Sequence, residues 1–139
     1  MSENEIAKQV VDAAYKVHTV LGPGLLESVY EAALACELGK RGLHVICQQA
    51  LAVKYEGIHL DVGFRADLIV EDKVIVEIKS VELVAPVHKK QLLTYLRLAD
   101  KRLGLLINFQ VALIKDGITR IVNRLDDDAH AKPLSRKDS

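Results

Sequence analysis

Hydrophobic and polar positions repeat at two different periods along the chain, and the change of period separates helical from extended segments. Over Glu3–Val20, apolar residues recur every three to four positions, which predicts a helix with Ser2 or Asn4 as its N-cap. The stretch "LGPG" at Leu21–Gly24 interrupts this pattern. The following "LLESVYEAALACELGKRG" predicts a second helix, which stops at the glycines that begin with Gly39.

After residue 44, β-branched residues and alternation replace the helical period. They predict strands near Val45–Tyr55, Ile58–Val70 and Val74–Val81, with "YEG" and "EDK" as the turns between them. Pro86 then begins "PVHKKQLLTYLRLAD", which predicts a helix with proline in its first turn.

The remaining pattern predicts more strands and a polar tail. "LGLLINF" reads as a strand, and "VALIKDGITRIV" predicts a hairpin about Asp116-Gly117. The element order is then ααβββαββ, an α/β sandwich with a central mixed sheet flanked by helices, in which one helix crosses between strands. We expect one domain over residues 1–125 and a polar, disordered tail over residues 126–139.

Composition narrows the classes of protein that remain. The 139 residues are half hydrophobic, which allows one substantial core. Nineteen basic residues balance nineteen acidic ones, so a phosphate-binding site would have to be a local basic patch. This balance weakens the interpretation as a nucleic-acid-binding protein but does not exclude it. No secretory pattern and no run of about 20 apolar residues is found, so we expect a cytoplasmic protein without a membrane partner. Cys36 and Cys47 lack metal-ligand spacing, and we expect reduced thiols in the core.

Charged residues interrupt the apolar stretch "DLIVEDKVIVEIKS", and the register of the predicted hairpin decides where they lie. Pairing Val70 with Val74 gives one apolar side, because it also pairs Leu68 with Val76 and Ala66 with Ile78. The other side then carries these pairs: Asp67 with Glu77, Arg65 with Lys79, and Ile69 with Ile75.

Two carboxylates on facing strands would have Cβ atoms about 4.5–5.5 Å apart, so they require a compensating cation or a proton. One interpretation is a surface hairpin in which Arg65 and Lys79 form ordinary salt bridges with the acids. The other is a hard divalent ion, Mg²⁺ or Mn²⁺, held by the carboxylates. Because the strands are apolar on both sides, they are expected to be central, which favours the ion. Such an ion activates water and stabilises charge on a phosphate, and Lys79 would assist it.

Asp67, Glu77 and Lys79 resemble the core motif of the PD-(D/E)XK nuclease superfamily, with ten positions from the first acid to the second and "EIK" on the second strand. Ala66 stands where the superfamily name has proline. That position faces the apolar side of the hairpin and leaves the acids in place. The resemblance covers roughly residues 5–124 and implies a nuclease fold.

A second motif adds to this resemblance. "GLLESVYEAAL" resembles the GxxExxY signature of a prokaryotic family within the superfamily, through Gly24, Glu27 and Tyr30. The family implies that Glu27 lies beside the strand acids as a third metal ligand or as a holder of water. The alternative is a glutamate that only favours the start of its helix. His18 could reach the same pocket, although a lone histidine is more often packed or at the surface.

The helix after the motif strands carries a third motif. Gln91 and Tyr95 are four residues apart, with His88 three before Gln91, which places all three on one face. They resemble the QxxxY motif of recombination exonucleases and CRISPR-associated nucleases, which implies contact with Lys79, the water around the metal or the DNA backbone. The alternative is a core tyrosine and a solvated glutamine. A basic side of the same segment could position phosphates: Lys89, Lys90, Arg97, Lys101 and Arg102.

Two functions follow from these motifs. The first is a Mg²⁺- or Mn²⁺-dependent nuclease that hydrolyses phosphodiester bonds in DNA, with catalytic residues Lys79, Glu77, Asp67, Glu27, Gln91 and Tyr95 and metal ligands Asp67, Glu77 and Glu27. The second is a non-catalytic relative that binds nucleic acid or a partner protein. Inactive relatives usually lack an acid or the lysine, and this chain has all three. The choice between a monomer and a homodimer stays open.

Overall fold

The computed structural model describes residues 1–125, apart from the side chains of Asp61 and Val62. The expected tail lies outside the described residues. The elements run in the order α1 (Glu3–Leu21), α2 (Glu27–Lys40), β1 (Val45–Tyr55), β2 (Ile58–Val70), β3 (Val74–Lys79), α3 (Pro86–Ala99), β4 (Leu103–Asn108), the 3₁₀ turn η1 (Ile114–Gly117) and β5 (Ile118–Val122). The expected order ααβββαββ is therefore confirmed. Among the described helices, none is long and apolar enough to cross a membrane.

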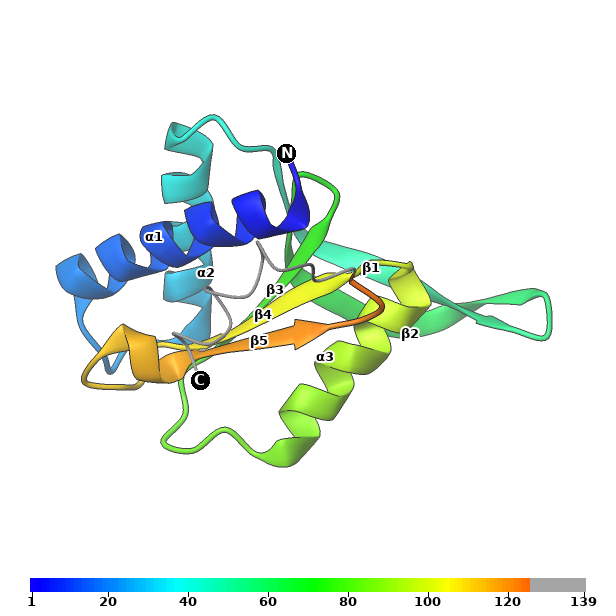
Figure 1. Ribbon diagram of the computed structural model, residues 1–139. Coiled ribbons are helices and arrows are strands. Elements are labelled where there is room, and N and C mark those ends of the chain that lie inside the picture. Colours follow the sequence, from blue (N-terminus) through cyan, green and yellow to red (C-terminus); the bar gives the residue numbers. More distant parts are fainter. Residues whose placement is uncertain (126–139) are drawn as a thin grey trace.

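The sheet has the strand order β1-β2-β3-β4-β5, so the two strands that carry the charged motif are internal. Neighbouring strands are antiparallel except for β3 and β4, which are parallel because α3 crosses over between them. Helices α1 and α2 cover one face of this mixed sheet, and α3 covers the other (Figure 1). The site described below lies where both helical layers approach β2 and β3.

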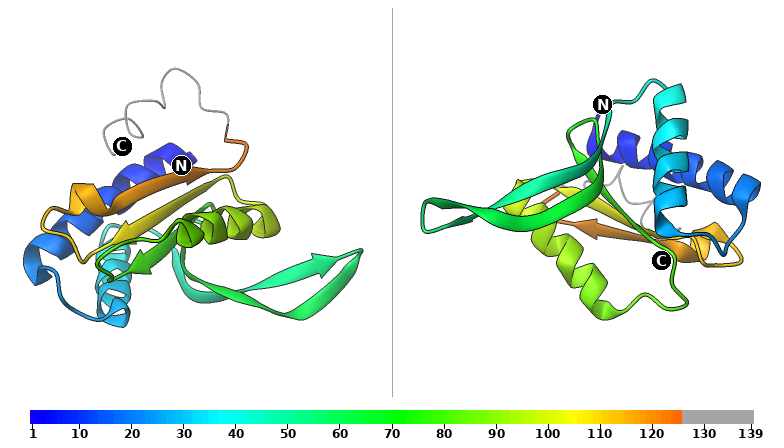
Figure 2. Two further views of the ribbon diagram at one scale, coloured as in Figure 1. Left: turned by 90° about the horizontal axis from the view of Figure 1, so that it is seen from below. Right: turned by 180° about the vertical axis from the view of Figure 1, so that it is seen from behind.

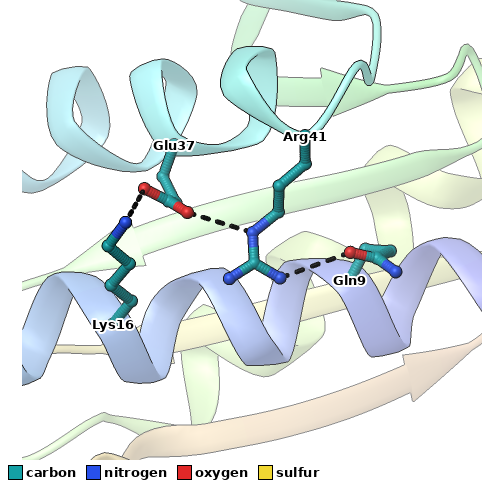
Figure 3. A network of polar contacts seen from close by, with 4 residues as sticks. All are labelled: Gln9, Lys16, Glu37 and Arg41. Carbon is teal, nitrogen blue, oxygen red and sulfur yellow. Dashed lines mark hydrogen bonds and ion pairs between the residues drawn. The ribbon is translucent and has the colours of Figure 1, made fainter.

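Helices α1 and α2 are held by their ends and by one another. Ser2 caps α1 as expected, because its hydroxyl accepts the Glu5 N–H while the Glu5 carboxylate accepts the Ser2 N–H. Glu37 of α2 forms ion pairs of 3.1 Å with Lys16 of α1 and with Arg41, and the Arg41 guanidinium also donates to Gln9 (Figure 3). These contacts hold α1 and α2 together, and the site described below lies beside the beginning of α2.

The α3 layer packs closely on the sheet because β4 carries a glycine. A Cβ added to Gly104 would lie 2.9 Å from the Leu92 side chain, so glycine lets this face of α3 approach the strand. Leu92 and Leu96 pack there with Ile69, Ile75 and the apolar side of β4. This contact positions the exposed and half-buried residues of α3 relative to β2 and β3.

Strands β1 and β2 extend beyond the layered body as a two-stranded arm, which Figure 2 shows from two sides. Tyr55 and Ile58, at its far end, are 60% and 61% exposed. The base of the arm is anchored by Phe64, whose ring stacks on that of Tyr95 with a centroid distance of 3.8 Å.

Two sequence-based predictions are wrong in detail. The hairpin expected about Asp116-Gly117 is the 3₁₀ turn η1 in a longer connection between β4 and β5. A Cβ on Gly117 would collide with the main-chain oxygen of Asn108, so glycine serves close approach there and not a hairpin turn. Strand β3 ends at Lys79, two residues earlier than predicted.

The cysteines and one hairpin residue also differ from expectation. Cys36, on α2, and Cys47, on the edge strand β1, are exposed and do not lie in the core. Ala66 packs with the α3-side cluster and not with Leu68 and Val76, because the regular pairing of β2 and β3 has ended before it.

Candidate functional site

The predicted hairpin register is confirmed where the backbone ladder forms. Strands β2 and β3 pair Val70 with Val74, Ile69 with Ile75 and Leu68 with Val76. The turn lacks glycine and instead places Glu71 and Asp72 at positive φ, 53° and 56°. One position further along both strands come Asp67 and Glu77, and there the ladder ends.

The two acids replace the missing backbone hydrogen bonds. The Glu77 carboxylate accepts the Asp67 main-chain N–H at 2.7 Å, and the Asp67 carboxylate accepts the Ile78 main-chain N–H at 2.8 Å. Each acid thus binds the opposite strand with one oxygen. A carboxylate oxygen has lone pairs for more than one partner, so the pair retains acceptor capacity towards a ligand. Arg65, expected opposite Lys79, is exposed and donates to the main-chain oxygen of Gln48 instead.

Burial sets the protonation of both acids. Glu77 is 9% exposed, and burial, followed by the negative charge of Asp67, raises its pKa from 4.5 to about 8. The pKa of the half-buried Asp67 is also raised, chiefly by burial, although its hydrogen bonds from Ile78 and Gln48 and the charge of Lys79 oppose the rise. A buried acid beside a half-buried one, both hydrogen-bonded by neutral amides, forms a site that favours added positive charge.

Lys79 ends β3 next to the acids. Its positive charge lowers the pKa of both Asp67 and Glu77. Its main chain is fixed, because it pairs with Asn108 and its carbonyl accepts the Phe109 N–H. Within residues 1–125, no hydrogen bond or ion pair holds its ammonium group. The ammonium is therefore placed by its backbone and is free to contact a ligand.

Glu27, the first residue of α2, is brought to the end of β3. Its carboxylate accepts the Ser80 N–H at 3.3 Å, and the Ser80 hydroxyl donates to the Leu25 main-chain oxygen at 2.6 Å. Glu27 is exposed, and its negative charge raises the pKa of Asp67. It therefore lies within electrostatic range of the strand acids while its carboxylate is bonded elsewhere.

Tyr30 and His18 have packing and hydrogen-bonding roles. Tyr30 is fully buried and stacks on Phe109 with a centroid distance of 4.4 Å. Its hydroxyl donates to the Gly22 oxygen at 2.5 Å and accepts the Leu25 N–H at 3.1 Å, so it pins the turn before α2. The buried His18 has its Nε2 2.8 Å from the Val111 oxygen, and a carbonyl only accepts, so Nε2 carries the hydrogen there. The contacts of His18 are with this turn region and not with the strand acids.

On α3, the three residues of the expected face have different surroundings. Tyr95 is half-buried against Phe64, and its pKa is raised by burial and then by the charges of Glu77 and Asp67, which places it near both acids. Gln91 is exposed one turn earlier. His88 accepts the Ala85 N–H through Nδ1 at 3.2 Å, so it caps the start of the helix.

Two residues that the motifs did not single out join the site. The Gln48 side-chain amide donates to Glu31 at 2.7 Å and to Asp67 at 3.3 Å. Glu31 lies four residues after Glu27 on the same face of α2, and this spacing could have indicated it. Nothing in the sequence indicates Gln48, because its role depends on a positive φ of 54° inside a strand.

The side chains that meet at this site are of the type that binds a hard cation, but those described are not already arranged as a metal-binding site. Among the described residues, no group of three or more His, Cys, Asp and Glu side chains is arranged to hold a metal ion. The donors that do meet, Asp67 and Glu77, are carboxylates, which Mg²⁺ and Mn²⁺ prefer. Their burial and raised pKa values show a deficit of positive charge that such an ion would relieve.

Comparison with known proteins agrees with this geometry. No curated protein and no solved structure matched the chain. The family model of the PD-(D/E)XK nuclease superfamily matches residues 4–121, which include every element described above except the last residue of β5 and the first of α1. The internal acids, the lysine that follows them and the mixed sheet between two helical layers are all within that match. The chain therefore belongs to the PD-(D/E)XK nuclease superfamily.

Proposed function

We propose that this protein is a divalent-metal-dependent nuclease that hydrolyses phosphodiester bonds in DNA. Members of its superfamily are mostly nucleases of phosphodiester bonds and typically use divalent metals such as Mg²⁺ or Mn²⁺. The observation that carries the proposal is the reciprocal bonding of Asp67 and Glu77 across the end of the β2–β3 ladder, with Lys79 beside them. We also propose that the chain is a GxxExxY protein within the superfamily, on the basis of Gly24, Glu27 and Tyr30.

Asp67 and Glu77 would hold Mg²⁺ or Mn²⁺, and Glu27 would be its third acidic neighbour. When bound, such an ion supplies positive charge to the phosphate and makes a nearby water more acidic. The rest of the chemistry falls to side chains of this chain. Because three acids alone would repel a phosphodiester, the ammonium of Lys79 supplies the nearest positive charge of the protein, with which it orients the attacking water and stabilises the transition state.

Helix α3 would position the substrate. Tyr95 and Gln91 lie one helical turn apart, with Tyr95 within electrostatic range of the acids, and would contact the phosphate backbone or the water near Lys79. Four exposed basic residues on and just after this helix could bind further phosphates: Lys89, Lys90, Arg97 and Arg102. Lys101, counted among them from the sequence, bonds to Asp72 instead.

Cleavage of DNA tests this proposal. We expect Mg²⁺- or Mn²⁺-dependent degradation of single- or double-stranded DNA that EDTA abolishes. Lys79→Ala should keep metal and DNA binding but lose cleavage by roughly 10²-fold or more, as for a lost electrostatic stabiliser. Lys79→Arg should rescue poorly, because a planar guanidinium does not replace a compact ammonium. Lys8→Ala, an exposed lysine on α1, serves as the matched control and should cleave like the wild type.

A second candidate function is a non-catalytic module that binds nucleic acid or a partner protein. It is favoured by the balanced charge of the chain and by the lack of a three-residue metal cage among the described residues. Wild-type protein that binds DNA but cleaves no substrate with either metal would establish this second function. Cleavage that survives both EDTA and Lys79→Ala would instead point to a contaminant or another site.

A further inference from the structure

Gln48 occupies an irregular position in β1, directly beside the site. Its neighbours pair regularly with β2, Cys47 with Leu68 and Gln49 with Ala66, whereas Gln48 and Asp67 form no ladder pair. Its backbone has a φ of 54°, a left-handed conformation that L-residues other than glycine rarely adopt. The sheet therefore opens at Asp67 on both sides, towards Gln48 and towards Glu77.

The exposed Gln48 side chain bridges two acids at this point. Its amide nitrogen lies 2.7 Å from Oε1 of Glu31 and 3.3 Å from Oδ1 of Asp67, so its two hydrogens join acids from two different elements. The main-chain oxygen of Gln48 accepts from the Arg65 guanidinium at 3.1 Å, which holds the irregular backbone in place. Gln48 is thus fixed at its main chain and bonded at its tip.

These bonds complete the orientation of Asp67. Its Oδ2 accepts the Ile78 N–H at 2.8 Å and its Oδ1 accepts from Gln48, so both oxygens of the carboxylate are held. The amide does this without a charge. A lysine or arginine in its place would neutralise the acids and compete with a cation, whereas a neutral amide orients them and leaves their negative charge available.

The same bonds bring Glu31 to the site. Glu31 is half-buried, and its charge contributes to the raised pKa of Glu77, so it is within electrostatic range of the second strand acid as well. Unlike Glu27, whose carboxylate bonds to Ser80, Glu31 is linked to a strand acid by a single shared donor.

We propose that Gln48 is a positioning residue of the metal site, which fixes the Asp67 carboxylate and couples Glu31 to it as a further acidic neighbour of the ion. The inference rests on the proposed function, and it assigns roles to two residues outside the sequence motifs. If only the irregular backbone mattered, glycine would be the most favourable residue, because it adopts positive φ without strain. Glycine has no side-chain amide, however, and could not form the bridge. The presence of glutamine at this φ is what favours the bridging role.

Two variants distinguish the effect of the Gln48 backbone conformation from the effect of its side chain. Gln48→Gly keeps the left-handed backbone and removes the bridge, and Gln48→Ala removes the bridge but keeps the strain. If Gln48 positions Asp67, both variants should bind Mn²⁺ about 10-fold more weakly than wild type in calorimetric titrations of the full chain, the lower end of the effect of outer-shell partners. Gln49→Ala is the matched control, because within residues 1–125 the Gln49 amide donates to the neighbouring Ala50 oxygen and not to an acid of the site, and it should bind Mn²⁺ like wild type.

A second measurement needs no metal. In NMR spectra of the metal-free protein, the side-chain amide signals of Gln48 should move on Glu31→Gln and on Asp67→Asn, and those of Gln49 should not. Glu31→Gln combined with Gln48→Gly should weaken Mn²⁺ binding by less than the sum of the two single effects, because both variants remove the Gln48–Glu31 bond.

The outcomes distinguish the two proposals. Wild type that binds Mn²⁺ while Gln48→Gly binds it equally well would overturn the positioning role and leave the nuclease proposal standing. Unmoved Gln48 amide signals in both acid variants would overturn the bridge itself. Wild type that neither binds a divalent ion nor cleaves DNA would overturn the proposed function, and the role of Gln48 towards a metal with it.

Discussion

At the scale of single residues, Glu77 is the group whose charge matters most to the stability of the domain. Its pKa of about 8 means that, without a metal, most molecules at neutral pH hold a proton on this buried carboxyl. The folded protein binds that proton more tightly than the unfolded chain, whose glutamates titrate near 4.5. The stability that this group contributes is therefore complete below about pH 4.5 and is lost as the pH rises through 8.

We accordingly expect the metal-free protein to melt at lower temperature at pH 9 than at pH 6, with Glu77→Gln showing a much smaller drop. The difference between the two proteins should be on the order of a few kcal/mol in the free energy of unfolding, since each pKa unit is worth about 1.4 kcal/mol. Thermal melts in EDTA across this pH range measure it. Equal pH dependence in both proteins would mean that Glu77 titrates as an ordinary glutamate.

Removal of the same side chain has a less obvious effect. From the sequence, relief of repulsion between two acids predicts that Glu77→Ala leaves the fold intact or slightly more stable. The hydrogen bond that the Glu77 carboxylate accepts from the partly buried Asp67 N–H favours the opposite result. At pH 6, where Glu77 is mostly protonated and little repulsion remains, Glu77→Ala should lower the free energy of unfolding by about 1–3 kcal/mol, the cost of an unsatisfied donor. Urea unfolding at pH 6 tests it, and at pH 9 the loss should be smaller.

At the scale of elements, the turn before α2 depends on a motif tyrosine. Tyr30→Phe would retain the stack on Phe109 but remove the hydroxyl that bonds both Gly22 and Leu25. We expect a loss of about 1–2 kcal/mol in the free energy of unfolding. Because Leu25 in turn accepts from Ser80, weaker Mn²⁺ binding should accompany this loss if Glu27 is placed by the turn.

Tyr55→Phe is the control for this substitution, since Tyr55 is 60% exposed at the end of the arm and should tolerate the change. Equal stabilities of Tyr30→Phe and wild type in urea would show that the buried hydroxyl contributes nothing to the turn.

How far the elements could be predicted depends on whether local or distant contacts determine them. The helices, their order and the β2–β3 register follow from periodicity, capping by Ser2 and the pairing of apolar positions, all of which are local in the sequence. The 3₁₀ turn at Ile114–Gly117 could not be predicted, because Gly117 is required by the oxygen of Asn108.

The candidate site divides in the same way. The motifs predict that Asp67 and Glu77 meet, and the structure brings them together. The bridge through Gln48 could not be predicted, because it needs an acid from α2, an acid from β2 and a left-handed residue in β1 at one point. The assignment of catalytic roles stays a prediction.

At the scale of the whole molecule, charge is balanced overall, so any affinity for DNA must come from a local patch. The exposed basic residues on and after α3 are the candidate patch, on the same side of the sheet as Tyr95. If they bind phosphates, the logarithm of the DNA-binding constant should fall with the logarithm of salt concentration, with a slope of about −0.9 for each contact on duplex DNA.

We therefore expect Lys89→Ala and Lys90→Ala together to reduce the steepness of this salt dependence by about 0.9–1.8, measured by fluorescence anisotropy with DNA in EDTA. Lys8→Ala, on the layer that covers the other face, should leave it unchanged. The same slope for all three proteins would show that Lys89 and Lys90 make no phosphate contact.

The exchange of main-chain partners between Asp67 and Glu77 also bears on how such a protein could lose its activity over evolutionary time. Each acid accepts a main-chain N–H across two internal strands. Replacing either acid therefore removes a hydrogen-bond acceptor and lowers the stability of the fold, in addition to any effect on catalysis. The Lys79 ammonium forms no comparable hydrogen bond among the described residues. A lineage retained only for binding would thus be expected to lose the lysine first and keep its acids, and an experimenter who wants an inert but well-folded version should follow the same route.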